Sequence, residues 1–158
     1  MKIRKASLKD IKEMNRIYIE GSIDEGKLQF PNISKNKMIK ELEKFEKERI
    51  NGWKKEFGSR DNHWVVAEEN KIICGFGNAE VKKNYSYKEG MVTMVYVDRN
   101  FRKKGIGEKI LKEVILWLRK KRVRYIEAGL YWKNIPSKKL NEKLGFKPIS
   151  LKMRLKIK

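Results

Sequence analysis

One junction constrains the fold of this chain more than any other stretch of its sequence. The apolar run MVTMVYV, from Met91 to Val97, has the composition of a buried strand. The cationic loop DRNFRKK follows it, and an apolar pattern of helical period begins at Gly105 and continues to about Lys121. The sequence therefore predicts a strand, a basic loop and a helix in direct succession, with Gly105 and Gly107 where the helix begins.

Such a junction is suited to binding an anion. The first turn of a helix leaves its backbone N–H groups unpaired, and glycine lets a phosphate come close to them. Arg102, Lys103 and Lys104 add positive charge. The loop lacks the GK[ST] ending of a P-loop, and no third glycine completes a dinucleotide fingerprint after Gly107. Taken alone, the loop also fits an ordinary start of a helix.

The rest of the hydrophobic pattern predicts a single α+β domain, residues 1–158, around a mixed sheet. Loops are expected at 21–33 and 82–90, and extended structure at the C-terminal FKPISLKMRLKI. The expected strands are Lys2–Ala6, His63–Ala67, Ile72–Val81, Met91–Val97 and Tyr125–Trp132. The expected helices are 7–20, 105–121, 134–144 and one that begins at Ser34 and ends at either Asn51-Gly52 or Phe57-Gly58.

Composition excludes several classes of protein and leaves one question open. The only cysteine is Cys74, and charged residues interrupt the apolar ones of the N-terminal MKIRKASLKDIKEM, so we expect a cytoplasmic protein without a membrane span. His63 is the only histidine and has no constellation of ligands around it, so no metal is expected. The net charge of +20 fits either a solvated lysine-rich surface or nucleic-acid binding. The sequence does not decide between a monomer and a homodimer.

Two motifs resemble those of the GNAT family of N-acetyltransferases. Arg102-x-x-Gly105-x-Gly107 resembles the family's acetyl-CoA signature, R/Q-x-x-G-x-G/A, between a strand and a long helix. NIPSKKLNEKLGF, from Asn134 to Phe146, resembles N-x-x-A-x-x-x-Y-x-K-x-G-F, and the order of elements is similar to the family's β-α-α-β-β-β-α-β-α-β plan. The resemblance covers essentially the whole chain. It implies a mixed, mostly antiparallel sheet that splits in a V at the cofactor slot, with flanking helices, and acetyl-CoA as the acyl donor.

The resemblance also implies which residues bind the cofactor. The loop would hold the pyrophosphate on its backbone N–H groups, and the preceding strand would pair with the pantetheine amides. Asn134 would reach the cofactor from the other wall, a role compatible with capping the short helix. The N–H of Val97 would stabilise the oxyanion. The implied cofactor-binding residues are Val95, Tyr96, Val97, Arg102, Lys103, Lys104, Gly105, Ile106, Gly107, Glu108 and Asn134.

The groups that move protons are harder to assign. Asn141 stands where the family often places a tyrosine acid, and an amide donates no proton to a thiolate. Strand alternation puts Glu127 on one face with Gly129, the place where some relatives carry a glutamate base, and Glu80 is the competing base. Either carboxylate could instead be an ordinary partner for lysine. Asp24 and Glu25, in the expected loop 21–33, are the best candidates for the amine-side wall.

Two functions follow as hypotheses. The first is transfer of acetyl from acetyl-CoA to a primary amine of a small molecule or a protein N-terminus, by direct attack on the thioester. The second is a basic nucleic-acid-binding domain on the same fold with a vestigial cofactor slot. The sequence identifies neither the acceptor amine nor whether the acyl group is acetyl or longer.

Overall fold

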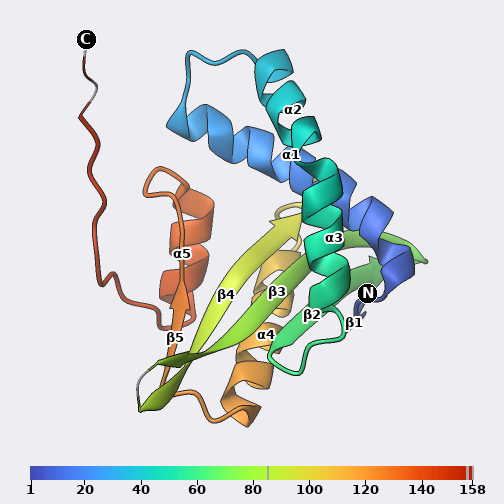
Figure 1. The fold of residues 1–158 in the computed structure, drawn as a ribbon, viewed down its shortest axis with the longest axis vertical. Helices are drawn as coiled ribbons and strands as arrows, with labels where there is room; N and C mark the ends of the chain where they lie inside the picture. Colours follow the sequence, from blue (N-terminus) through green and yellow to red (C-terminus); the bar gives the residue numbers. More distant parts are fainter. Residues whose placement is uncertain (85, 156, 158) are drawn as a thin grey trace.

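The computed structural model describes residues 1–84, 86–155 and 157 and contains a mixed five-stranded sheet (Figure 1). The strands lie in chain order, and neighbours are antiparallel except for the last pair, which is parallel. This arrangement confirms the α+β prediction. The strands are β1 (Lys2–Lys5), β2 (Asn62–Glu69), β3 (Ile72–Asn84), β4 (Tyr87–Val97) and β5 (Tyr125–Ala128).

Helices cover both faces of the sheet and produce two cores. On one face α1 (Ile11–Gln29) and α3 (Glu46–Glu56) bury an aromatic cluster that includes Trp53, Trp64 and Phe76. On the other face α4 (Ile106–Lys120) buries an apolar stripe at helical spacing. Figure 1 shows α2 (Lys35–Lys44) beyond α1, and α5 (Ile135–Lys143) beside β5. Two 3₁₀ turns, η1 (Leu8–Asp10) and η2 (Arg99–Phe101), precede α1 and α4.

The sheet opens between β4 and β5, as the sequence predicts. The parallel pairing of these strands ends at Val92 and Ala128, while β4 continues to Val97. Thr93 forms a bulge there, because Val92 pairs with Ala79 and Met94 pairs with Asn78. The hydroxyl of Thr93 donates a hydrogen bond to Oδ1 of the buried Asn78, which fixes the bulge. The second half of β4 therefore presents a free edge to the opening.

Three predictions between residues 21 and 90 are wrong. The predicted loop 21–33 is helical as far as Gln29, because Gly21 and Gly26 sit where a tyrosine ring and a methionine sulfur pack against α1. The predicted helix from Ser34 is two helices that meet at Phe45. The predicted loop 82–90 is mostly strand, since β3 and β4 extend into one long hairpin.

The C-terminal half also departs from expectation in two places. The strand predicted for Tyr125–Trp132 ends at Ala128, where the chain turns towards α5. No strand occurs in the described part of the C-terminal segment, 146–155 and 157, which runs apart from the sheet beyond α5 (Figure 1). Its apolar side chains are exposed, and Arg154 lies 4.8 Å from the ring centroid of Phe30. The alternation of this segment is typical of a strand, but strand formation also needs a partner edge.

Candidate active site

A row of unpaired donors marks the start of α4. The backbone N–H groups from Lys103 to Glu108 have no hydrogen-bond acceptor among the described residues; the next one, of Lys109, donates to the carbonyl of Gly105 at 3.2 Å. The loop that carries them is exposed. Consecutive free N–H groups at the positive end of a helix dipole form an anion site.

Two residues in the left-handed backbone conformation orient these N–H groups. Lys103 has φ 63° and Gly105, the N-cap of α4, has φ 74°. Alternation of right- and left-handed backbone turns successive N–H groups towards one concave side, as in an anion-binding nest. Gly105 meets this requirement without strain, whereas Lys103 is held there by the loop. Anion contact at this loop stays a prediction, and the backbone geometry is suited to it.

The glycine inside α4 faces the opening between β4 and α5. A Cβ at Gly107 would lie 3.6 Å from Val97 Cγ2 and 3.5 Å from Leu140 Cδ2, both ordinary contacts. Val97 belongs to β4 and Leu140 to α5, so the first turn of α4 lies against both walls of the slot. A larger side chain at Gly107 would project into that slot.

The free edge of β4 offers donors along the slot. The N–H of Asp98 donates to the carbonyl of Cys74 on β3 at 2.9 Å. Because hydrogen-bonding direction alternates along an antiparallel strand, Tyr96 also points its N–H to β3, while Val95 and Val97 point theirs away. Pairing with β5 has ended before Val95, so both N–H groups face the opening.

The loop is fixed to α1 by ion pairs, a contact that the sequence analysis did not anticipate. Asp24 accepts from Arg99 Nη2 and Arg102 Nη1, both at 2.7 Å, and Arg102 Nε donates to the carbonyl of Val97 at 3.1 Å. Arg16 pairs with Asp98 nearby. Burial opposes ionisation of Asp24, but the two guanidinium groups outweigh it and lower the pKa of its carboxyl. Arg102 is therefore a partner of Asp24 as well as a loop cation.

Glu25 connects the two walls of the slot. Its Oε2 accepts from the hydroxyl of Tyr96 on β4 at 3.2 Å, and its Oε1 lies 3.4 Å from Nδ2 of Asn134, the N-cap of α5. Oδ1 of Asn134 accepts from the N–H of Ser137 at 3.2 Å, so one side chain both caps the helix and lines the slot. Burial raises the pKa of the Glu25 carboxyl, and the two hydrogen bonds partly offset this. The sequence analysis placed Glu25 in the substrate wall without this bridging role.

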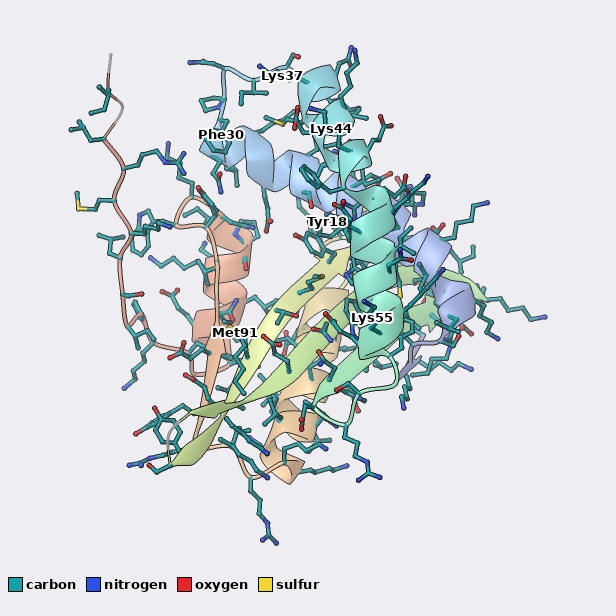
Figure 2. The ribbon with its side chains drawn as sticks, viewed as in Figure 1. Tyr18, Phe30, Lys37, Lys44, Lys55 and Met91 are labelled. Atoms are coloured by element: carbon teal, nitrogen blue, oxygen red, sulfur yellow. The ribbon has the colours of Figure 1, made fainter. Side chains whose placement is uncertain are left out.

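The two predicted bases lie elsewhere, towards the closed end of the slot. Glu80 on β3 lies opposite Met91 on β4, and Met91 lies opposite Glu127 on β5. The side chains of both glutamates are therefore on the same face of the sheet as Met91, which is labelled in Figure 2. Glu80 is 2.9 Å from Lys82 in an ion pair. Burial, and then the neighbouring Glu89, raise the pKa of the Glu127 carboxyl. Among the described residues, the hydrogen bonds of Tyr96 and Asn134 across the slot go to Glu25 and not to either of these glutamates.

Asn141, which the resemblance matches to the family's usual tyrosine, lies on α5. It is 7% exposed, its Nδ2 donates to the carbonyl of Ser137 at 2.9 Å, and Oδ1 has no partner among the described residues. Ser137 lies one turn before Asn141 on the same face of the helix. A buried acceptor without a donor is unusual in a folded protein.

The described residues contain no group of three or more potential metal ligands. Within the same part of the chain, no helix is long and apolar enough to cross a membrane.

A sheet that parts beside a helix with free N–H groups is the arrangement of acyl-CoA-dependent acetyltransferases. The chain belongs to the acetyltransferase (GNAT) family, whose model matches residues 29–146. The family uses acetyl-CoA as acyl donor, and this membership confirms the resemblance read from the two motifs.

Solved structures share the fold over nearly their whole length. A mutant of the BH1408 protein from Bacillus halodurans is 19% identical, with a TM-score of 0.76 over 99% of this chain and 100% of that one. A predicted acetyltransferase from Clostridium acetobutylicum, solved with acetyl-CoA, is 21% identical, with a TM-score of 0.74 over 98% and 95% of the two chains. An aminoglycoside 6′-N-acetyltransferase from Acinetobacter haemolyticus is 13% identical, with a TM-score of 0.71 over 100% and 99%. No curated protein matches the chain.

Proposed function

We propose that this chain is an acetyl-CoA-dependent N-acetyltransferase that acts on a primary amine of a small molecule or a protein N-terminus. One observation carries the proposal: the unpaired N–H groups from Lys103 to Glu108 lie beside the free edge of β4. These groups would bind the pyrophosphate, Val95 and Val97 would pair with the pantetheine, and Asn134 would line the opposite wall. Acetyl-CoA would supply the activated acetyl group.

The chemistry requires little else from the protein. The N–H of Val97 would stabilise the negative charge that develops on the thioester oxygen, because a fixed donor in a partly desolvated site favours that charge. The amine must lose a proton before it attacks, and Glu127, Glu80 and Glu25 are the carboxylates available on the α1 side of the slot. The leaving thiolate has a pKa of about 8.5, so its departure does not demand an acid.

Calorimetry with acetyl-CoA, followed by thiol release in a screen of amines and peptides, tests the proposal. We expect acetyl-CoA binding and at least one amine that releases free thiol. Failure to bind at millimolar acetyl-CoA would exclude the enzyme.

A second candidate function, nucleic-acid binding, has one observation in its favour. A hollow of about 440 Å³ at the far end of β4 is lined by four cations and no carboxylate. Tyr87 also lines it, and Arg124 lies 5.5 Å from the ring centroids of both Tyr87 and Tyr125. Cations interleaved with aromatic rings suit a single-stranded polyanion. Salt-dependent binding of an oligonucleotide, unaffected by acetyl-CoA, would support this function. The cations are Lys83, Lys88, Arg122 and Arg124.

The loop cations should each contribute modestly to cofactor affinity. We expect Arg102→Ala or Lys103→Ala to weaken acetyl-CoA binding by about 0.5–2 kcal/mol, because exposed ionic contacts are screened while the backbone donors remain. Calorimetry at two salt concentrations measures this effect.

The ion pair with Asp24 provides a matched control for Arg102. Removing Arg102 exposes the Asp24 carboxylate beside the anion site, so the double variant Asp24→Asn/Arg102→Ala should bind better than Arg102→Ala. If Arg102→Ala or Lys103→Ala weakened acetyl-CoA binding by more than about a hundredfold, roughly 2.7 kcal/mol, the loop side chains would contribute more to the affinity than the backbone N–H groups.

Asn141 should not act as a general acid, although it stands where the resemblance places one. We expect Asn141→Ala to change kcat by less than about tenfold, or roughly 1.4 kcal/mol of transition-state stabilisation, because an amide supplies no proton. Asn141→Tyr should raise kcat where thiolate departure limits the rate, with KM for acetyl-CoA unchanged, and Asn141→Phe should not. A larger loss in the alanine variant would mean that the buried, unpaired Oδ1 orients the substrate.

A further inference from the structure

Two donors hold the bridging carboxylate of Glu25, and one of them, Tyr96, is itself packed tightly against α1. A Cβ at Gly21 would lie 2.3 Å from Tyr96 Cδ1, so glycine lets the tyrosine ring lie directly against α1. Tyr18 and Phe76 fix the same ring, with centroids 5.4 and 5.6 Å away. The Tyr96 hydroxyl and Asn134 Nδ2 then hold one carboxylate oxygen each.

The protonation of this cluster is set by burial. Burial, and then the charge of Glu25, raise the pKa of the Tyr96 hydroxyl well above its ordinary value, so the phenol stays protonated and donates. In the described part of the chain no cation forms an ion pair with Glu25, and the groups that bear on it are Tyr96 from β4 and Asn134 from α5. The adjacent Asp24 differs, because Arg99 and Arg102 neutralise it. Glu25 is therefore a half-buried carboxylate that lacks a counterion.

We propose that Glu25 binds the ammonium group of the acceptor amine at the open end of the slot and takes its proton. This role rests on the acetyltransferase activity proposed above. The site fits a carboxylate–ammonium contact because an incoming cation would supply the charge that Glu25 lacks. Tyr96 and Asn134 are positioning residues that keep the carboxylate between the walls.

The step balances in atoms and charge. The ammonium nitrogen gives one proton to Glu25, which passes it to water, and the neutral amine forms a bond to the thioester carbonyl carbon. The carbon–sulfur bond then breaks, its electron pair leaves on sulfur, and the second nitrogen proton ends on the thiolate. The products are an amide, free coenzyme A and one proton in solution.

Position favours Glu25 over the two glutamates predicted from the sequence. Glu80 and Glu127 lie level with Met91, before the strands part, and Lys82 already pairs with Glu80. Glu25 lies level with Tyr96 and Asn134, beyond the point where the pairing of β4 with β5 ends.

The same geometry narrows the class of acceptor. Asp24 is neutralised, so one unpaired carboxylate faces the opening and accommodates one ammonium group. The net charge of +20 opposes a second cation on the same ligand. The site is therefore suited to primary monoamines, including protein N-termini with neutral or acidic neighbours, and disfavours polyamines.

Two amines of similar size separate proton transfer from binding. Phenethylamine is protonated at neutral pH, whereas O-benzylhydroxylamine is already neutral. With Glu25→Gln, kcat/KM for phenethylamine should fall by at least about a hundredfold, a typical loss for a general base. The rate with O-benzylhydroxylamine and the Kd for acetyl-CoA should stay within about threefold. Glu20→Gln changes a half-exposed glutamate of α1 that pairs with Arg16, and it is the control. It should leave the rates with both amines and the Kd for acetyl-CoA unchanged.

A pH profile tests the positioning of the carboxylate. The acid limb that the Glu25 carboxyl contributes to kcat/KM for phenethylamine should disappear in Glu25→Gln, which leaves only the rise towards the pKa of the amine itself. In Tyr96→Phe it should move to higher pH, because the lost hydrogen bond had favoured the ionised carboxylate.

Each outcome bears on a distinct claim. If Glu25→Gln lowered kcat/KM equally for both amines, or weakened acetyl-CoA binding, Glu25 would shape the cofactor site. Either result would overturn its role as a base. A wild-type enzyme that binds acetyl-CoA but turns over neither amine, or prefers spermine at low salt, would overturn the assignment of monoamines. Absence of acetyl-CoA binding in the wild type would instead contradict the proposed function itself.

Discussion

Gly107→Glu should abolish measurable binding of acetyl-CoA. The new side chain would project from the first turn of α4 into the slot between Val97 and Leu140, where the free N–H groups converge. Its carboxylate would replace an anion that those groups favour, at the end of the helix where the dipole is positive. We expect the Kd to rise at least about a hundredfold, or roughly 2.7 kcal/mol, in a calorimetric titration.

Two variants make this result specific to the site. Gly107→Ala should bind acetyl-CoA within about fivefold of the wild type, because a Cβ there makes only ordinary contacts. Gly58→Glu adds the same charge at an exposed position with nothing within 4 Å and should have no effect. Unchanged affinity in a folded Gly107→Glu variant would show that the anion binds elsewhere.

Replacing two helical glycines by alanine should change the stability in opposite directions. At Gly21 in α1 the added Cβ would overlap the Tyr96 ring, at 2.3 and 2.6 Å from two of its carbons. We expect the free energy of unfolding in urea to fall by about 1–3 kcal/mol, the usual cost of overpacking. At Gly52 in α3 a Cβ would have nothing within 4 Å. Alanine there should raise the free energy of unfolding by about 0.5–1 kcal/mol, because it has a higher helix propensity than glycine.

The double variant Gly21→Ala/Tyr96→Leu tests the stated cause. Removing the ring should restore part of the lost stability, as expected for two residues in direct contact. If Gly21→Ala is as stabilising as Gly52→Ala, the ring moves aside freely and α1 does not depend on this contact.

The junction proposed to bind the cofactor was predictable from sequence as a structure, because its determinants are local. A strand, a basic loop and a helix start were visible from Met91 to Lys121, and Gly105 supplies a left-handed residue where the helix begins. Backbone donors need no particular side-chain partners elsewhere in the chain, so the motif alone predicted Lys103 to Glu108 as the anion site. The family model supports the resemblance on which the cofactor assignment was based.

The acceptor half was not predictable in the same way. Glycines at 21 and 26 indicated a loop, yet the segment is helical, because Tyr96 and Met38 pack where those residues lack a side chain. The contact between Glu25 and Asn134 joins residues that are 109 positions apart in the chain. Periodicity carries no signal for such a pair.

The sequence by itself determined the α+β class, the succession of strand, basic loop and helix start, and the family, because each depends on local pattern and short motifs. Only the tertiary structure decided where β4 and β5 part, that Asp24 is neutralised while Glu25 is not, and that Arg102 contacts α1. The physical reason is that burial, counterions and strand pairing arise between segments distant in the chain. The charge state and reach of a side chain are fixed by those neighbours.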